Sequence, residues 1–110
     1  MLQAEIHSGQ EVIETLTKYL KKNKIKKAAI VSVIGALDSF SLSTMDKKDG
    51  QKVITTDYSE PVELTGTGEV VDGKPHLHVT VGRDNASALM GHLEWGKVKD
   101  WFVHVYILPL

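Results

Sequence analysis

A single amphipathic helix followed by strand-like segments is the sequence pattern that most limits the folds open to this chain. The segment "HSGQEVIETLTKYLKKNKIKKA", residues 7–28, predicts the helix, and Ser8 with Glu11 three residues later predicts a capping box at its start. Apolar residues recur within it at helical spacing, at Val12, Ile13, Leu16, Tyr19 and Leu20. From Ala28 onward the signals are those of strands, so we expect one helix that packs against a sheet.

The expected strands are short and are separated by turns rich in Gly and Asp. They are "LQAEI" before the helix and then "AAIVSVI", "FSLSTM", "KVITTDY", "VELTGTGEVV", "HLHVTV" and "VKDWFVHVYIL", while "ASALMGHL" fits either a strand or a helical turn. The unbroken apolar run "AAIVSVI" predicts a central strand that is covered on both faces and ends at Gly35. Gly66 and Gly68 predict bulges or a close backbone approach. The predicted fold class is therefore α+β, a mostly antiparallel β-sheet packed against one main α-helix.

Length and composition restrict the chain to one globular domain over residues 1–110, because 110 residues cannot form two separate cores. The absence of cysteine excludes disulfides, thiolate zinc sites and cysteine nucleophiles. It leaves oligomerisation as a source of extra stability. A formal net charge of -1 gives no overall attraction to nucleic acid or to an anionic membrane. No segment approaches the roughly 18 apolar residues of a membrane span, so we expect a soluble cytoplasmic protein without a membrane partner.

Three of the five histidines lie close together in the expected strands. His76 and His78 occupy alternate positions of one strand and therefore face the same side, about 7 Å apart. His92, from a neighbouring segment, can complete a three-nitrogen face whose fourth position is left to water. Zinc suits three neutral imidazoles, and iron, nickel or cobalt fit the same ligand type. The alternative is that the three rings fill a polar subunit interface or make only hydrogen bonds.

Three further residues are candidates for ligand binding beside the histidines. Arg83, the only arginine, lies in the turn between the two histidine segments, where its planar guanidinium can hold a carboxylate or phosphate at two points. Its alternative role is a solvated turn residue paired with Asp84 or another acid. Glu69 and Glu94 can transfer protons or accept the second N–H of a ligating imidazole, and are otherwise ordinary surface acids. No full acid and base set is recognisable, so the sequence leaves enzymatic activity open.

Three stretches of the sequence resemble, in the same order, the plant and prokaryote conserved (PPC) domain family, also called domain of unknown function 296 or the PD1-like DNA-binding family. They are "SGQEVIETLTKYLKKNKIKKAAIVSVIGALDSFSL", "EPVELTGTGEVVDGKPHLHVTVGRDN" and "ALMGHLEWGKV". They begin at residue 8 and end at residue 98, so the resemblance extends over nearly the whole length of the chain. The resemblance implies an α+β domain that assembles as a homotrimer, with the His-x-His and Gly-His-Leu segments at one site. A more distant similarity to acetolactate decarboxylase, a zinc enzyme of related fold, supports zinc or another divalent metal at His76, His78 and His92.

The resemblance leaves two functions open. One is a metal-binding protein with a small-molecule binding or lyase-type role, in which the ligand is a small anion. The other is a trimeric DNA-associated or protein-interaction module without catalysis, whose histidines are structural. Plant members of the family bind DNA through Arg-Gly-Arg-Pro arms, and this sequence contains no Arg-Gly-Arg stretch. Its one basic cluster has a sufficient structural role opposite the negative pole of the helix dipole. The cluster consists of Lys18, Lys21, Lys22, Lys24, Lys26 and Lys27.

Overall fold

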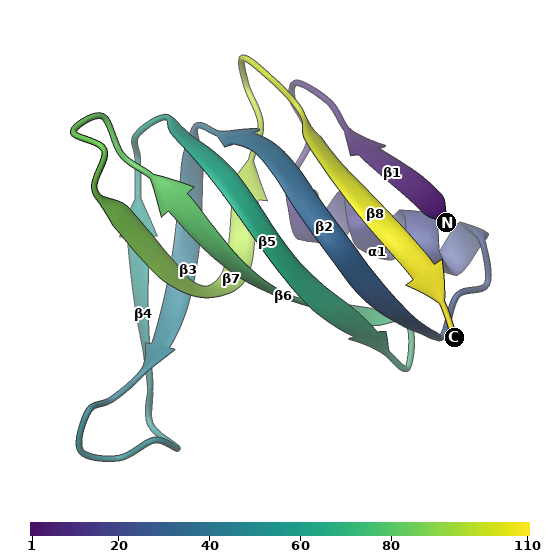
Figure 1. The fold of residues 1–110 in the computed structure, drawn as a ribbon, viewed down its shortest axis with the longest axis horizontal. Helices are drawn as coiled ribbons and strands as arrows, with labels where there is room; N and C mark the ends of the chain where they lie inside the picture. The colour runs from purple at the N-terminus through teal and green to yellow at the C-terminus, as the bar shows by residue number, and fades with distance from the viewer.

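All 110 residues are described by the computed structural model, which contains one helix and one eight-stranded sheet (Figure 1). The elements follow along the chain as β1 (Leu2–Ile6), α1 (Val12–Lys22), β2 (Lys27–Leu37), β3 (Ser39–Met45), β4 (Val53–Tyr58), β5 (Val62–Val71), β6 (Lys74–Gly82), β7 (Ala88–Lys97) and β8 (Val103–Pro109). The spatial order of the strands is β1-β8-β2-β5-β6-β7-β3-β4, and all neighbours are antiparallel. The predicted antiparallel sheet with one helix is confirmed.

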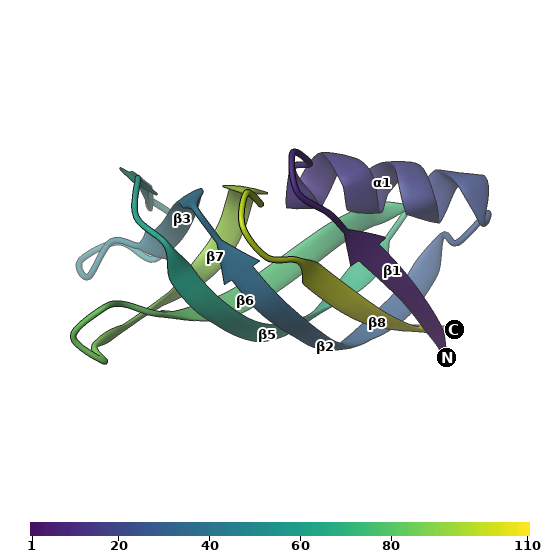
Figure 2. The same cartoon turned by 90° about the horizontal axis from the view of Figure 1, so that it is seen from above.

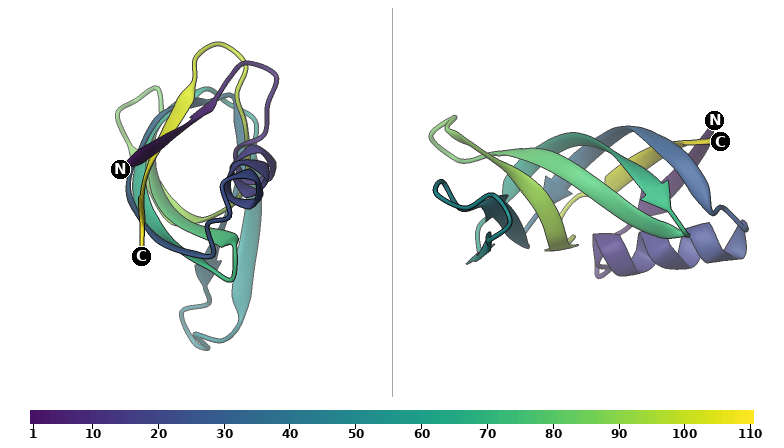
Figure 3. Two further views of the ribbon diagram at one scale, coloured as in Figure 1. Left: turned by 90° about the vertical axis from the view of Figure 1, so that its right-hand side faces the viewer. Right: turned by 90° about the horizontal axis from the view of Figure 1, so that it is seen from below.

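The sheet is strongly curved, and α1 lies along its concave side (Figure 2). Seen end-on, the strands form a trough whose open side the helix covers (Figure 3). Val12, Leu16 and Leu20 of the helix are fully buried and join the inward side chains of the strands in one hydrophobic core. The convex side of the sheet, called the outer face below, has no second layer of secondary structure within the chain, and the candidate site lies on this face.

The helix begins later than the capping box predicts. Glu11 is the N-cap, and its carboxylate accepts hydrogen bonds from the backbone N–H groups of Ile13 and Glu14, at 2.9 and 2.8 Å. The Ser8 hydroxyl instead donates to the backbone oxygen of Lys99, because the chain turns at this point before it enters the helix. The predicted Ser8 cap is therefore wrong. The single helix also falls short of the length and apolar character that a membrane span requires.

Strand β2 differs from its prediction in two ways. It continues through Gly35 to Leu37, since Gly35 allows a close approach to the neighbouring chain segment: a Cβ there would lie 1.9 Å from the backbone oxygen of Phe102. It is also covered on one face only. Val31 and Ile34 point to the outer face, where 46% and 52% of their surface is exposed. The apolar run therefore supplies more apolar surface than the core of one chain uses.

The last two strands also have corrected boundaries. The ambiguous segment "ASALMGHL" belongs mostly to strand β7, and the final strand starts only at Val103. Residues 98–102 form the connection before β8. The Asp38 carboxylate accepts hydrogen bonds from the backbone N–H groups of Lys99 and Asp100, at 2.6 and 3.2 Å. These two groups are thereby satisfied without a neighbouring strand, which explains why β8 is shorter than predicted.

Candidate metal centre

The three histidines converge on the outer face of strands β6 and β7. His76 and His78 alternate with Leu77, whose side chain is fully buried in the core. The antiparallel register of β6 and β7 places His92 directly opposite His78. One ring nitrogen of each histidine lies within 4.8 Å of the other two, and the centroid of the His76 ring lies 4.9 Å from that of His78 and 4.8 Å from that of His92. The structure thus brings all three predicted residues into one cluster.

Two glycines allow the strand that carries His76 and His78 to run close to its neighbour β5. Gly66 and Gly68 occupy inward positions of β5, opposite Val79 and Leu77 in the register. A Cβ at Gly66 would lie 2.4 Å from the backbone oxygen of His78, and a Cβ at Gly68 would lie 2.1 Å from that of His76. The predicted close backbone approach is therefore present, and it occurs directly at the two histidine positions.

Both predicted carboxylates lie beside a histidine. Glu69 is the register partner of His76, and its Oε2 lies 3.8 Å from His76 Nδ1. Glu94 follows His92 by two positions in β7, and its Oε1 lies 3.7 Å from His92 Nε2. These separations exceed hydrogen-bond length, but they put each carboxylate where it can orient an imidazole after a small side-chain rotation.

Ser43 is a polar residue of the site that the sequence did not suggest. Its side chain is 6% exposed, and its hydroxyl donates a 2.7 Å hydrogen bond to Glu94 Oε1. In the register of β3 and β7, Ser43 is opposite His92. The alternation within "FSLSTM" indicates a face for Ser43, but only the pairing of β3 with β7 shows that this face is shared with the histidines.

His92 is the least exposed of the three histidines, and its protonation reflects this. Burial lowers the pKa of His92 below its ordinary value of 6.5; the Glu94 carboxylate opposes this shift, while charge on His76 or His78 adds to it. The neutral form of His92 is therefore favoured. Since only a neutral imidazole has a lone pair for a metal ion, the cluster favours the ligating form of this residue.

A pocket of about 540 Å³ opens beside the cluster. His78 and His92 contribute to its lining, together with Glu94 and Ser43. Apolar side chains from three different strands complete it, at Met45, Val53 and Met90. The histidines are therefore accessible from a cavity whose volume lies within the range of small-molecule sites.

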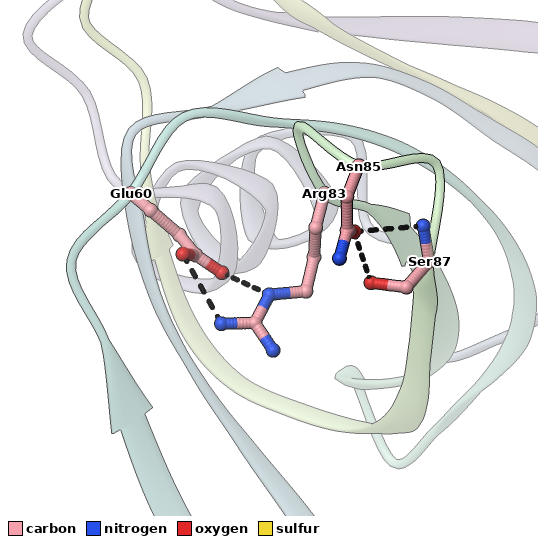
Figure 4. A network of polar contacts seen from close by, with 4 residues as sticks. All are labelled: Glu60, Arg83, Asn85 and Ser87. Carbon is pink, nitrogen blue, oxygen red and sulfur yellow. Dashed lines mark hydrogen bonds and ion pairs between the residues drawn. The ribbon is translucent and has the colours of Figure 1, made fainter.

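Arg83 lies away from the histidines within one chain. It follows the opposite end of β6, five residues beyond His78, a separation of roughly 16 Å along an extended chain. Its Nε and Nη2 donate to the two carboxylate oxygens of Glu60 at 2.6 and 3.2 Å (Figure 4). Its guanidinium carbon also lies 5.9 Å from the centre of the Tyr58 ring. Within one chain Arg83 is therefore paired with an acid, as its alternative role describes, and it lines no part of the pocket beside the histidines.

The donor set of the cluster suits a divalent transition metal. Three imidazole nitrogens from two paired strands are the ligands that zinc accepts in sites that keep an open position. Nitrogens bound to one zinc ion are separated by roughly 3.3 Å, as follows from a Zn–N distance of about 2.0 to 2.1 Å. The present separations are up to 4.8 Å, so a metal ion requires the three rings to move closer together. His76 and His78 are exposed, which leaves their side chains room to rotate.

Comparison with known proteins gives a consistent result for family and fold. The family model of the Plants and Prokaryotes Conserved (PCC) domain matches residues 1–110. None of the curated proteins matches the chain. Several solved structures match over almost the whole chain. One is a plant- and prokaryote-conserved protein from Pyrococcus horikoshii, with 23% identity, a TM-score of 0.82, and coverage of 99% of this chain and 78% of that one.

Two other solved structures carry names that bear on function. A metal-containing protein from Archaeoglobus fulgidus is 30% identical, with a TM-score of 0.77, and the match covers 99% of this chain and 78% of that chain. A protein from Bacteroides thetaiotaomicron, named as a candidate DNA-binding protein, is 26% identical, with a TM-score of 0.83 and coverage of 97% and 76%. The names of these two proteins correspond to the two functions that the sequence leaves open.

Proposed function

The chain belongs to the Plants and Prokaryotes Conserved domain family, and from this membership together with the histidine cluster we propose that it is a metal-binding protein whose ligands are His76, His78 and His92. The observation that carries the proposal is the convergence of three imidazoles from two paired strands on an exposed face, next to a pocket. The metal content of the Archaeoglobus fulgidus relative, at 30% identity, supports it.

Zinc is the metal that we propose, with other divalent transition metals as alternatives of the same ligand type. A bound zinc ion with an open position supplies a Lewis acid or an acidified water. Glu69 and Glu94 then orient His76 and His92 by accepting their second ring N–H groups, and Ser43 holds Glu94 in place through its 2.7 Å hydrogen bond. The ligand of the site is a small molecule that enters through the pocket.

Elemental analysis of protein purified without a histidine tag and reconstituted with zinc tests the proposal. We expect about one zinc per chain in the wild type and less than about a tenth of this in His78→Ala. His7→Ala is the matched control, because His7 is also exposed and has only Glu5 within ion-pair distance, at 3.4 Å. Absence of zinc from the wild-type protein, or equal loss in the two variants, contradicts the proposal.

We also propose that the chain assembles as a homotrimer, as the family resemblance implies, and that the subunits meet through its outer face. The exposed apolar side chains of β2 support this assembly. Val31 and Ile34 lie on β2, an interior strand of the sheet, and Leu108 on the adjacent strand β8 is 43% exposed. A second copy that packs on this face gives β2 the cover on both sides that its apolar sequence favours.

DNA association is the second candidate function, and it rests on the name of the Bacteroides thetaiotaomicron relative and on the lysines near the end of α1. An electrophoretic mobility shift with duplex DNA in increasing salt tests it. If the lysines contact phosphates, the shift weakens as salt rises and disappears in a Lys21→Glu, Lys22→Glu double variant. We expect no shift at moderate salt, because the chain has a formal net charge of -1.

A further inference from the structure

The pocket beside the histidines has an apolar wall, formed by Met45, Val53 and Met90, and no basic residue in its lining. From this composition we propose that the site takes a small organic ligand with an apolar body and at most one negative charge, and that it disfavours phosphorylated compounds and other polyanions. The inference rests on the proposed metal site, because the polar end of the ligand binds the metal. It specifies the class of ligand, which the metal site by itself does not.

The wall consists of three apolar side chains on the same face of the sheet as His92. Met45 lies two positions beyond Ser43 on β3 and pairs with Val53 of β4 in the register, while Met90 lies two positions before His92 on β7. Their exposed fractions are 73%, 60% and 58% for Met45, Val53 and Met90. Exposed apolar side chains around a polar centre give an apolar ligand group surface to bury.

Glu94 supplies the pocket with a hydrogen-bond acceptor. Glu94 lies where the pairing of β3 with β7 shifts register, between the pairs Ser41–Trp95 and Leu42–Leu93. Such an irregularity can direct a side chain to a position that regular pairing would not allow. One oxygen, Oε1, accepts from Ser43, and no hydrogen bond within the chain uses Oε2. Oε2 is therefore free to accept from an O–H or N–H group of the ligand.

Apart from the metal ion, whose positive charge binds the polar end of the ligand, the pocket offers no positive charge to a second anionic group. None of the nine residues that line it is lysine or arginine, and Glu94 is negatively charged. Sites for phosphoryl groups usually place arginine, lysine or several backbone N–H groups around the anion. The ligand best matched to this pocket therefore has an oxygen donor for the metal, an adjacent O–H or N–H for Glu94, and an apolar substituent against the three wall residues.

Hydroxamic acids are suitable probes, since they combine oxygen donors, a neighbouring N–H and a variable substituent. Isothermal titration calorimetry on zinc-loaded protein of measured zinc content compares three of them. We expect benzohydroxamic acid to bind about tenfold more tightly than acetohydroxamic acid, because its ring contacts the wall. We expect 4-carboxybenzohydroxamic acid, which adds a second negative charge, to bind at least about fivefold more weakly than benzohydroxamic acid.

A matched pair of variants locates the effect. Val53→Ser removes one wall residue from an edge strand, and Val71→Ser makes the same change at a valine that is 53% exposed and lies outside the pocket. We expect Val53→Ser to weaken the binding of benzohydroxamic acid about threefold or more, with little effect on the binding of acetohydroxamic acid. We expect Val71→Ser to change neither affinity. Equal affinity of benzohydroxamic and acetohydroxamic acid for zinc-loaded protein, or equal effects of the two variants, overturns the proposed ligand class and leaves the metal site standing. A protein that holds no zinc overturns the metal site and the ligand class together.

Discussion

His92 differs from the other two histidines of the cluster because part of its side chain is buried and close to a carboxylate. Burial lowers its pKa below 6.5, and Glu94 only partly offsets this shift. In the metal-free protein the folded state therefore binds a proton at His92 less readily than the unfolded state does. By linkage, this difference stabilises the fold above the unfolded pKa near 6.5, and the stabilisation is lost as the pH falls through the lower folded pKa.

We therefore expect the free energy of unfolding of the metal-free protein to decrease between about pH 7 and pH 5, the range around the ordinary histidine pKa. The His92→Gln variant cannot take up this proton and should show a smaller decrease over the same range. Urea denaturation at several pH values, with a chelator present, measures the free energy of unfolding of the wild type and of His92→Gln. An identical slope for wild type and His92→Gln contradicts the prediction.

The residues of the site differ in how far their positions were predictable from the sequence. His76 and His78 face the same side because a strand alternates, a rule that needs only local sequence. The Ser43 to Glu94 hydrogen bond joins residues 51 positions apart, and the Arg83 to Glu60 pair joins residues 23 positions apart. Both depend on which segments meet in space, and composition and periodicity do not contain this information.

At the scale of elements, the strands and the helix were predictable where local patterns determine them, and boundaries were wrong where contacts from distant segments determine them. Strand β5 occupies residues 62–71 as its sequence predicts. The start of α1 differs because Glu11 accepts from its own first turn and also from the backbone N–H of Gly96, at 2.9 Å. The start of β8 differs because Asp38 binds the preceding loop. In both cases a distant side chain or backbone group decides the boundary.

The contact between β5 and β6 gives a prediction for stability and for the site. Gly68→Ala would place a Cβ 2.1 Å from the backbone oxygen of His76, so the two strands must separate. We expect the free energy of unfolding to fall by about 2 kcal/mol or more and zinc affinity to fall with it, because His76 moves. Gly82→Ala, in β6 with no atom within 4 Å of the added Cβ, should leave both unchanged. Urea denaturation and zinc titration of the two variants provide the test, and equal stability contradicts it.

At the scale of the whole molecule, the outer face connects the apolar surface of β2 to the pocket beside the histidines. The registers place Ile34 opposite Thr65 of β5, Thr65 opposite Thr80 of β6, and Thr80 opposite Met90 of β7. Met90 is one of the three wall residues of the pocket. A second hollow of about 620 Å³ on this face includes Ile34 and the exposed Trp101. In the proposed trimer, a subunit that covers Ile34 would therefore lie close to the pocket, and assembly and ligand binding would share one surface.

Ile34→Glu tests whether this surface holds the subunits together. The substitution puts a charge at the centre of the outer face, where burial against a second copy would be costly, whereas the exposed side chain tolerates it within one chain. We expect the wild type to have about three times the 12.1 kDa mass of one chain and Ile34→Glu to have the mass of one, with unchanged circular dichroism. Lys21→Glu, on the helix at the opposite side of the sheet, should keep the wild-type mass. Sedimentation equilibrium measures all three proteins, and a monomeric wild type would show that β2 keeps its apolar outer residues for a different reason.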